Sequence, residues 1–404
     1  MTFERRPRTL DSRSSATLCV RAGQGKSDGE PLVLPIVQST TFFQEGLESQ
    51  AKHRYSRESN PTVAALEQAL GDLEDAPPAV CYATGLAAEA GLFTTLLEAG
   101  EHVVASRAIY GGTTRLLEQI FPRFGIGATF VDTRDLAAVQ GAIRPETKLV
   151  FLETPANPTL DVTDIEAVAS IAHDAGALVA VDNTFLTAVL QRPLELGADI
   201  SVYSTTKLID GHSVALGGAL VTRDKALLER LAFTRKCTGG VQAPFNAWLT
   251  LQGLKTLPLR IAQQSANAEA VASWLKEQPE TLVVHYPGME QSDQLDIARR
   301  QHLGAHGAVV SFELEGGQDR ARRLLQHVRL CTLVEHVGAV QTLLTHSASM
   351  THAGVARADR ERVGVTEGLL RISVGLEDPR DVIEDLGQAM RASEQEVLSC
   401  TTSD

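Results

Sequence analysis

Two polar clusters that follow apolar, β-branched segments contain a lysine and an acid suited to pyridine–aldehyde chemistry. Lys207 ends the sequence Ser-Thr-Thr-Lys at 204–207, directly after the strand-like segment 199–203. Asp182 opens the sequence Asp-Asn-Thr after a second such segment, 177–181. Pyridoxal 5′-phosphate (PLP) chemistry requires an amine that forms a Schiff base and a carboxylate that holds the proton of the pyridine nitrogen. Asp182 also suits a helix cap or turn, so the pair by itself only suggests this cofactor.

A phosphate site is the second feature that such a cofactor needs. Thr84, Gly85 and Leu86 lie at a predicted strand-to-helix turn, where free N–H groups and the helix dipole favour an anion. The hydroxyls of Ser204 and Thr206 flank Lys207 and can reach the same phosphate. The alternatives are an ordinary turn that binds nothing and routine polarity at the end of a strand.

Three further side chains have types that suit a flat cofactor and an amino-acid substrate. Tyr110 follows a predicted strand, where its ring can stack on a cofactor and move protons; a turn aromatic is the alternative. Asn157 follows another strand, and its amide can reach a ring oxygen, although Asn-Pro is also a common turn. Arg371 is an arginine within an apolar strand. A buried guanidinium needs an anion, which is either a substrate carboxylate or a structural ion-pair partner.

Tyr203 and Lys207 also form a Tyr-x-x-x-Lys pair, which short-chain dehydrogenases use. Those enzymes need a glycine-rich dinucleotide turn as well. The segment 23–26, Gly-Gln-Gly-Lys, is not followed by a convincing helix. We therefore set the dehydrogenase interpretation aside.

The elements that position these residues alternate between strand-like and helix-like segments. The predicted strands cover residues 79–82, 102–105, 148–152, 177–181 and 199–203, and the predicted helices cover 85–97, 113–121 and 165–175. This alternation predicts an α/β fold with a mostly parallel central sheet that helices cover on both faces. Sites in such sheets lie at the carboxyl ends of the strands.

The chain is predicted to divide into three parts. Residues 1–60 are rich in Gly, Ser, Arg and Pro and predict an extended arm that packs on a neighbouring subunit. Residues 61–256 form the predicted cofactor-binding domain. Residues 257–404 form a smaller C-terminal α/β domain with predicted strands at 309–312 and 369–373, and the helical stretch 248–274 leads into it with an interruption at Pro258.

Composition restricts the partners and the compartment. The chain has 404 residues, a hydrophobic content of 43%, a charged content of 22% and a net charge of −13. The negative charge argues against nucleic acid or an anionic membrane as the main partner. Five scattered cysteines without a CxxC pair predict neither a disulfide framework nor a metal site. With no apolar leader and no run of about 18 apolar residues, the sequence predicts a cytoplasmic protein.

Taken together, these segments resemble the transsulfuration (Cys/Met metabolism) family of PLP enzymes, which includes cystathionine γ-synthases and γ-lyases, methionine γ-lyase and the homoserine-ester sulfhydrylases. The resemblance covers nearly the whole chain. The matching segments are 35–42, 55–62, 84–88, 110–113, 182–185, 204–212, 350–352 and 370–373.

The resemblance implies a role for each candidate residue. Lys207 would be the Schiff-base lysine, Asp182 the partner of the pyridinium, and Tyr110 the stacking residue and acid/base. Asn157 would contact the ring hydroxyl, and Arg371 would bind the substrate carboxylate. The phosphate would be held by Gly85, Leu86, Ser204 and Thr206, with Tyr55 and Arg57 reaching the phosphate of the neighbouring subunit. The implied fold is the aspartate-aminotransferase type (fold type I), in a homotetramer built from two catalytic dimers.

The sequence departs from the family pattern at the substrate end. The family's Ser-Leu-Gly facing the reactive lysine is His-Val-Gly at 336–338, and the acid that follows it in many members is Gln341. We expect His336 and Gln341 to line the substrate end of the pocket; the alternative is that both only adjust the loop. The loop at 211–218 is closer to the sulfhydrylase branch.

The expected activity is PLP-dependent γ-elimination or γ-replacement on a γ-substituted amino acid, such as cystathionine, homocysteine, an O-acylhomoserine or a divergent secondary-metabolic compound. The alternatives are a β-eliminating C–S lyase of the same family and a non-catalytic PLP-binding protein. The sequence does not choose between elimination and replacement.

Overall fold

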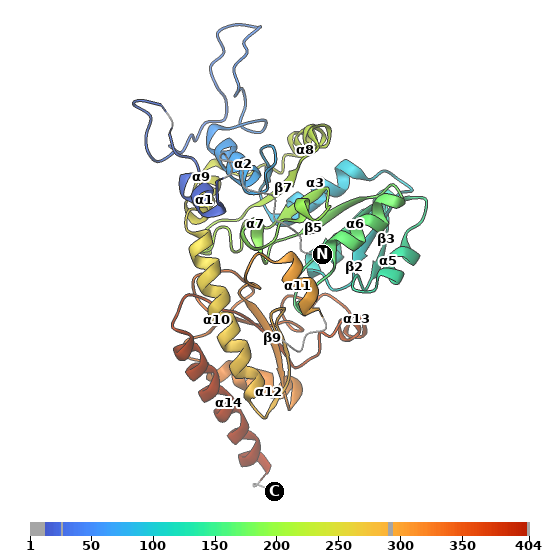
Figure 1. Cartoon of the computed structure of the whole chain (residues 1–404), viewed down its shortest axis with the longest axis vertical. Helices are drawn as coiled ribbons and strands as arrows, with labels where there is room; N and C mark the ends of the chain where they lie inside the picture. Colours follow the sequence, from blue (N-terminus) through green and yellow to red (C-terminus); the bar gives the residue numbers. More distant parts are fainter. Residues whose placement is uncertain (1–12, 26, 290–293, 402–404) are drawn as a thin grey trace.

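The computed structural model describes residues 13–25, 27–289 and 294–401. Residues 1–12 and 26 of the predicted arm lie outside the described part of the chain. Residues 290–293 and 402–404 of the predicted C-terminal domain also lie outside it. Figure 1 shows one sheet with its helices in the upper part of the molecule, a second sheet below it, and the helix α10 (Leu257–Glu277) running down beside both.

Within the described residues, the first sheet has seven strands in the order β1-β7-β6-β5-β4-β2-β3 and is called the large sheet below. Its strands are β1 (Val80–Tyr82), β2 (His102–Ser106), β3 (Gly127–Val131), β4 (Thr147–Glu153), β5 (Leu178–Asp182), β6 (Ile200–Tyr203) and β7 (Gly218–Thr222). All neighbours pair in parallel except β7, which is antiparallel to both β1 and β6. The prediction of a mostly parallel central sheet is confirmed.

Helices cover both faces of the large sheet because successive strand residues point to opposite faces. In β4, Leu149 and Phe151 pack toward α3 and α8, whereas Val150 and Leu152 pack toward α5 and α6. The helices of this part are α1 (Ser15–Arg21), α2 (Pro61–Leu73), α3 (Gly85–Leu96), α4 (Gly111–Arg115), α5 (Leu136–Ala142), α6 (Ile165–Asp174), α7 (Thr187–Leu190), α8 (Lys225–Thr238) and α9 (Pro244–Leu254). Short η segments cover Leu116–Ile120, Phe121–Phe124 and Pro193–Glu195.

The second sheet, called the small sheet below, has five strands among the described residues, in the order β10-β11-β12-β9-β8. Its strands are β8 (Thr281–His285), β9 (Val309–Leu314), β10 (Thr332–Leu333), β11 (Leu343–His346) and β12 (Leu369–Ser373). The helices that follow α10 are α11 (Leu295–Gln301), α12 (Gly317–His327), α13 (Arg357–Arg362) and α14 (Pro379–Thr401). Side chains of α10, α12 and α14 form one apolar core with β9, β11 and β12.

The predicted strands and helices are present, with some shifts at their ends. The predicted helix 113–121 is divided into α4 and the η segments after it, and the predicted interruption at Pro258 is a break at residues 255–256 between α9 and α10. We did not predict β3, β7, β8, β10 and β11. The domain boundary at 256 stays a prediction.

The arm is extended over most of its described length. Its helix α1 packs against α2 and α10 of the same chain, and the segment after it forms long loops that project from the top of the molecule in Figure 1. Phe43 and Leu47 in these loops are exposed. Among the described helices, none combines the length and the apolar character that a membrane span requires.

Candidate active site

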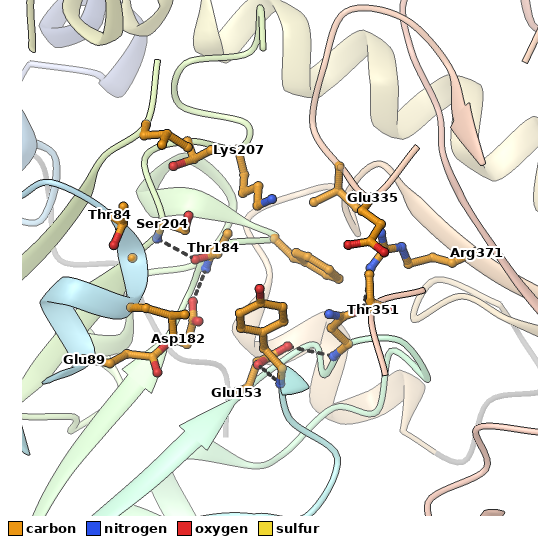
Figure 2. A pocket seen from close by; sticks show the side chains of 18 of the residues that line it. Thr84, Glu89, Glu153, Asp182, Thr184, Ser204, Lys207, Glu335, Thr351 and Arg371 are labelled. Atoms are coloured by element: carbon orange, nitrogen blue, oxygen red, sulfur yellow. Dashed lines mark hydrogen bonds between the residues drawn. The ribbon is translucent and has the colours of Figure 1, made fainter. Parts of the chain in front are cut away.

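A cavity of about 340 Å³ lies at the carboxyl ends of β4, β5 and β6, where the α/β pattern predicts a site. The small sheet contributes its opposite wall. Of the predicted residues, those that line this cavity are Gly85, Leu86, Tyr110, Asn157, Asp182, Ser204, Thr206, Lys207 and Arg371. In Figure 2, Lys207 reaches toward the middle of the cavity, with Asp182 and Glu89 on one side and Glu335 and Arg371 on the other.

The start of α3 forms one end of the cavity. Thr84 caps the helix, since its Oγ1 accepts a hydrogen bond from the Ala87 N–H at 3.0 Å. The first N–H groups of a helix have no acceptor within the helix, so those of Gly85 and Leu86 are available to an anion. A Cβ atom on Gly85 would come within 2.9 Å of the Ser204 Cβ, so only glycine lets the helix start approach this closely.

The hydroxyl-bearing residues beside Lys207 are held by their neighbours. The Ser204 N–H donates to Thr184 Oγ1 at 2.8 Å, which fixes the Ser204 backbone beside the start of α3. Thr206 Oγ1 donates to the Gly217 carbonyl at 3.1 Å and accepts from the Gly217 N–H at 3.0 Å. Its hydroxyl proton must turn away from Gly217 before Thr206 can donate to a phosphate.

The carboxyl groups of Asp182, Glu153 and Glu89 lie close together in this part of the cavity. Glu153 and Asp182 are register partners at the ends of β4 and β5. Glu153 accepts from the N–H groups of Tyr110 and Asn157, both at 2.8 Å. Burial raises the pKa of Asp182 to about 6, against the opposing effects of Thr184 and Lys207. Burial and the neighbouring acids Asp182 and Glu89 raise the pKa of Glu153 well above its usual value.

Lys207 lies between the two ends of the cavity. Its Nζ is 3.3 Å from Nδ1 of His336. Burial and the positive charge of Arg371 lower the pKa of Lys207 to about 8, while Asp182 opposes the change. Burial, Lys207 and Arg371 lower the pKa of His336 to about 4, so this imidazole is neutral at pH 7 and its Nδ1 can accept from the lysine ammonium.

Arg371 in β12 has its guanidinium buried at the other end of the cavity. Its Nη1 donates to Asn157 Oδ1 at 2.7 Å, and its Nη2 donates to Thr345 Oγ1 at 3.1 Å. Its Nε is buried without a hydrogen-bond partner, and Arg371 takes part in no ion pair within the described residues. The structural ion pair that was the alternative for Arg371 is therefore not found there, and the guanidinium can accept an anion from the cavity.

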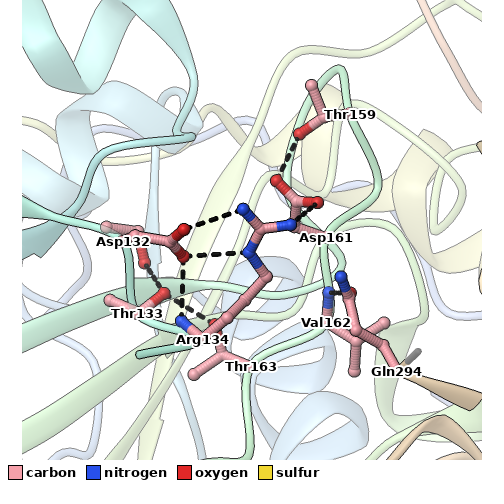
Figure 3. Close-up of polar contacts among 9 residues, drawn as sticks. Asp132, Thr133, Arg134, Thr159, Asp161, Val162, Thr163 and Gln294 are labelled. Atoms are coloured by element: carbon pink, nitrogen blue, oxygen red, sulfur yellow. Dashed lines mark hydrogen bonds and ion pairs between the residues drawn. The ribbon is translucent and has the colours of Figure 1, made fainter. Parts of the chain in front are cut away.

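The loop that carries Asn157 is held by a polar network at the surface (Figure 3). Arg134 donates to Asp132 Oδ2 at 2.7 Å and to Asp161 Oδ1 at 3.0 Å. Thr159 Oγ1 donates to Asp161 Oδ2 at 2.8 Å. The Asp161 carbonyl accepts from the Ala156 N–H at 2.9 Å, next to Asn157. This network links the end of β3 to the loop after β4 and so fixes Asn157 beside Arg371.

Of the remaining predicted residues, His336 lies between the lining residues Glu335 and Val337. Its Nδ1 contacts Lys207, and its carbonyl accepts from Arg371 Nη2 at 3.3 Å. Its role in selecting the substrate stays a prediction. Gln341 is exposed and does not line the cavity of its own chain, so its expected place at the substrate end stays a prediction. Tyr55 and Arg57 are exposed on the arm, where Arg57 Nη1 donates to the Lys236 carbonyl at 2.7 Å and lies over the Tyr55 ring.

Several lining residues were not predicted. They include Glu89, Arg115, Glu153, Thr184, Glu335 and Thr351. Glu153 and Thr184 follow the same rule as Asp182, since polar groups at the carboxyl end of a parallel strand face the site. Glu89 gives no such signal, because it lies within a helix whose neighbouring residues are apolar.

The cavity fits PLP by its own features. Free N–H groups beside Ser204, a buried acid, a lysine with a lowered pKa and an arginine without an ion pair lie around one space. Each is costly to bury without a ligand, and each corresponds to a different group of the cofactor or of an amino acid. The volume lies within the usual range for small-molecule sites.

Comparisons with known proteins agree with this arrangement. The family described as Cys/Met metabolism PLP-dependent enzymes matches residues 16–391. The chain is 41% identical to cystathionine gamma-lyase of Bacillus subtilis (strain 168), covering 93% of this chain and 98% of that protein. It is 40% identical to O-succinylhomoserine sulfhydrylase of Pseudomonas aeruginosa, covering 95% and 96%. The solved structure of cystathionine gamma synthase from Xanthomonas oryzae pv. oryzae, in complex with aminoacrylate and cysteine, superimposes with a TM-score of 0.92 at 37% identity, covering 95% and 99%.

Proposed function

This chain belongs to the Cys/Met metabolism family of PLP-dependent enzymes, and we propose that Lys207, Asp182 and Arg371 are the residues on which its reaction depends. The fold is of type I, as expected. The enzyme uses PLP and an amino-acid substrate and catalyses elimination or replacement at the γ-carbon. The observation that carries the assignment of residues is the position of Lys207 between a buried acid and a buried arginine within one cavity.

Each end of the cavity binds a different part of the ligands. The N–H groups of Gly85 and Leu86 and the hydroxyl of Ser204 would bind the cofactor phosphate. The Asp182 carboxylate would accept from the ring nitrogen, and the Tyr110 ring would stack on the cofactor. Asn157 has its Oδ1 on Arg371, so its NH₂ group is the part that donates to the ring oxygen. When bound, PLP supplies an electron sink for charge that develops at the substrate Cα.

Lys207 moves the protons. Because the pKa of Lys207 is lowered to about 8, the unprotonated fraction of Nζ rises from about one tenth at pH 7 to about one half at pH 8. The unprotonated Nζ would take the proton from Cα and would have to give it up before it, or a neighbouring base, takes a proton from Cβ, so that the substituent at the γ-carbon can leave with the electron pair of its bond. His336 Nδ1 accepts a hydrogen bond from Nζ and orients it. Arg371 binds the α-carboxylate, which places Cα next to Nζ.

The arm supports a site that two subunits share. Tyr55 and Arg57 are exposed and lie outside the cavity of their own chain, so they are available to a neighbouring subunit. A homotetramer made of two such dimers is part of the proposal, as is a cytoplasmic location, which agrees with the free state of Cys19, Cys81, Cys237 and Cys331. Arg57→Ala should weaken both PLP retention and the dimer, measured by absorbance after dialysis and by light scattering. An active wild-type monomer would rule out the shared site.

The function is tested with a panel of substrates. The purified protein is incubated with cystathionine, O-succinylhomoserine or methionine, each with and without cysteine, and the products are identified by mass spectrometry. Formation of a 2-oxo acid and ammonia indicates elimination, and cystathionine that forms from O-succinylhomoserine or methionine only when cysteine is present indicates replacement. Lys207→Ala serves as the control and should abolish both. A protein that binds no PLP and gains no visible absorbance on its addition would overturn the proposal.

A further inference from the structure

Glu89 is one of the carboxyl groups in the cavity that the function proposed above does not use. Glu89 lies in α3, is 3% exposed and lines the cavity. Its Oε2 is buried without a hydrogen-bond partner among the described residues. A buried carboxyl without a partner is costly to fold, since it must either shed its charge or find a donor or acceptor.

The position of Glu89 along α3 places it near the far end of the cofactor site. Gly85 and Leu86 begin the helix at the proposed phosphate site, and Glu89 follows one turn later on the same face. In Figure 2 its carboxyl group points toward Asp182. Glu89 therefore lies on the cavity wall between the proposed phosphate site and Asp182, the acid proposed to hold the ring nitrogen.

Charged and titratable groups face Glu89 from several elements. Asp182 comes from β5 and Glu153 from β4, and Thr113 of α4 offers a hydroxyl. Lys207 faces Asp182 from the loop after β6. Two neighbouring carboxyl groups in a buried site cannot both be ionised at low cost, so one of them keeps a proton.

We propose that Glu89 is a positioning residue that stays protonated and donates from its carboxyl O–H to Asp182, which holds Asp182 as an oriented carboxylate toward the cofactor ring nitrogen. The inference deepens the proposed function and rests on the role of Asp182 in it. No covalent step is involved, because Glu89 only keeps its proton.

The pKa values of the two acids also indicate that Glu89, and not Asp182, keeps the proton. Burial and the negative charge of Asp182 raise the pKa of Glu89 to about 8. Thr184 and Lys207 limit the rise in the pKa of Asp182, which reaches about 6. Between pH 6 and pH 8 the proton is on Glu89 and the negative charge is on Asp182. Above pH 8 Glu89 ionises, and the hydrogen bond to Asp182 is lost.

The variants Glu89→Gln and Glu89→Leu separate this role from packing. The amide of Gln still donates to Asp182 but cannot ionise, whereas Leu has a similar size and cannot donate. Glu98→Gln, which removes an exposed carboxyl just beyond the end of α3, is the matched control. Thermal unfolding of each variant reports whether the fold is intact.

The first measurement is infrared difference spectroscopy of the full-length protein without cofactor. Wild type should show a protonated-carboxyl component at pH 7 that disappears above about pH 8 and is missing in Glu89→Gln, whereas the component from Glu153, whose pKa burial also raises, should be common to both proteins. This readout does not depend on PLP binding, so it tests Glu89 even if the proposed function fails. Identical carboxyl spectra for wild type and Glu89→Gln at pH 7 would overturn the inference.

The second measurement is the PLP dissociation constant as a function of pH. Glu89→Leu should bind PLP about 10-fold more weakly at pH 7, as expected for the loss of a hydrogen bond to a charged group. The dissociation constant of Glu89→Gln should stay within about threefold of the wild-type value, and the ratio of these two constants should change only above pH 8. In an Asp182→Ala background Glu89→Leu should have no further effect. Wild-type affinity of Glu89→Leu, or an equal loss in both backgrounds, would contradict action through Asp182.

Discussion

The two ends of the cavity are opposite in charge and come from different sheets. The cofactor end is built from α3 and the parallel strands of the large sheet, and it contains the carboxyl groups of Glu89, Glu153 and Asp182. The substrate end is built from the small sheet and contains Arg371, with His336 nearby. Lys207 responds to both, since Arg371 lowers its pKa and Asp182 raises it. On the proposed roles, the large sheet holds the cofactor, while the small sheet holds the carboxylate of the amino acid.

If this division holds, removing the acid of the cofactor end should mainly lower turnover. Asp182→Ala is expected to reduce kcat by about 100- to 1000-fold, since a ring nitrogen without its proton is a poor electron sink. The KM for the amino acid should change little. Steady-state kinetics with saturating PLP measure both constants, and thermal unfolding checks the fold. Near-wild-type turnover would mean that Glu89 or Glu153 takes over the ring nitrogen.

The corresponding change at the substrate end should mainly weaken binding. Arg371→Met keeps an unbranched stem and removes the charged guanidinium, so kcat/KM is expected to fall by about 10- to 100-fold, mostly through KM. A substrate analogue with an amide in place of its carboxylate provides the control. Wild type should discriminate strongly against this analogue, and the variant should not. A loss confined to kcat would show that Arg371 acts in the chemical step and not in substrate binding, which would contradict the division between the two ends of the cavity.

Selectivity should respond to His336 and not to Gln341. His336 contacts Lys207, whereas Gln341 is exposed outside the cavity. His336→Asn is therefore expected to change the ratios of kcat/KM across the substrate panel by about 10-fold, and Gln341→Glu by less than about twofold. Equal shifts from both variants would show that Gln341 acts on the site from a neighbouring subunit.

The smallest effect concerns stability in acid. Burial lowers the pKa of His336 from 6.5 to about 4, so between these values the unfolded chain takes up a proton that the folded chain does not. The unfolding free energy should therefore fall as the pH decreases from about 6.5 to about 4. His336→Asn should reduce this slope in urea unfolding measured at several pH values. The slope should not vanish, because burial also lowers the pKa of His352 to about 4; an unchanged slope would contradict a neutral, buried His336.

The sequence predicted the cofactor end better than the substrate end for physical reasons. Asp182 ends β5, Ser204 directly follows β6, and Asn157 lies in the loop after β4. Parallel strands bring their carboxyl ends to one edge of the sheet. Arg371 was also predictable, because a charge inside an apolar strand needs a partner. Glu89 was not, since nothing near it in the sequence marks a ligand-facing helix position.

The elements and positions that stay open from the sequence belong to segments whose place depends on distant pairing. β7 follows the lysine loop and joins the sheet antiparallel to β6, a direction that its apolar sequence does not encode. The positions of His336 and Gln341 depend on how the segment before β11 passes the lysine. One lies beside Lys207 and the other is exposed, although only five residues separate them in the chain.

The hydrogen bond from Arg371 to Asn157 joins residues 214 positions apart in the chain and crosses from one sheet to the other. It marks the junction that a recombined gene would have to preserve. A chimera that takes residues up to β8 from this protein and the rest from a relative would exchange the substrate end as a block while keeping the cofactor end. Such hybrids should fold and retain PLP when the arginine and asparagine still match, which makes this single contact a design rule for recombining selectivity among relatives.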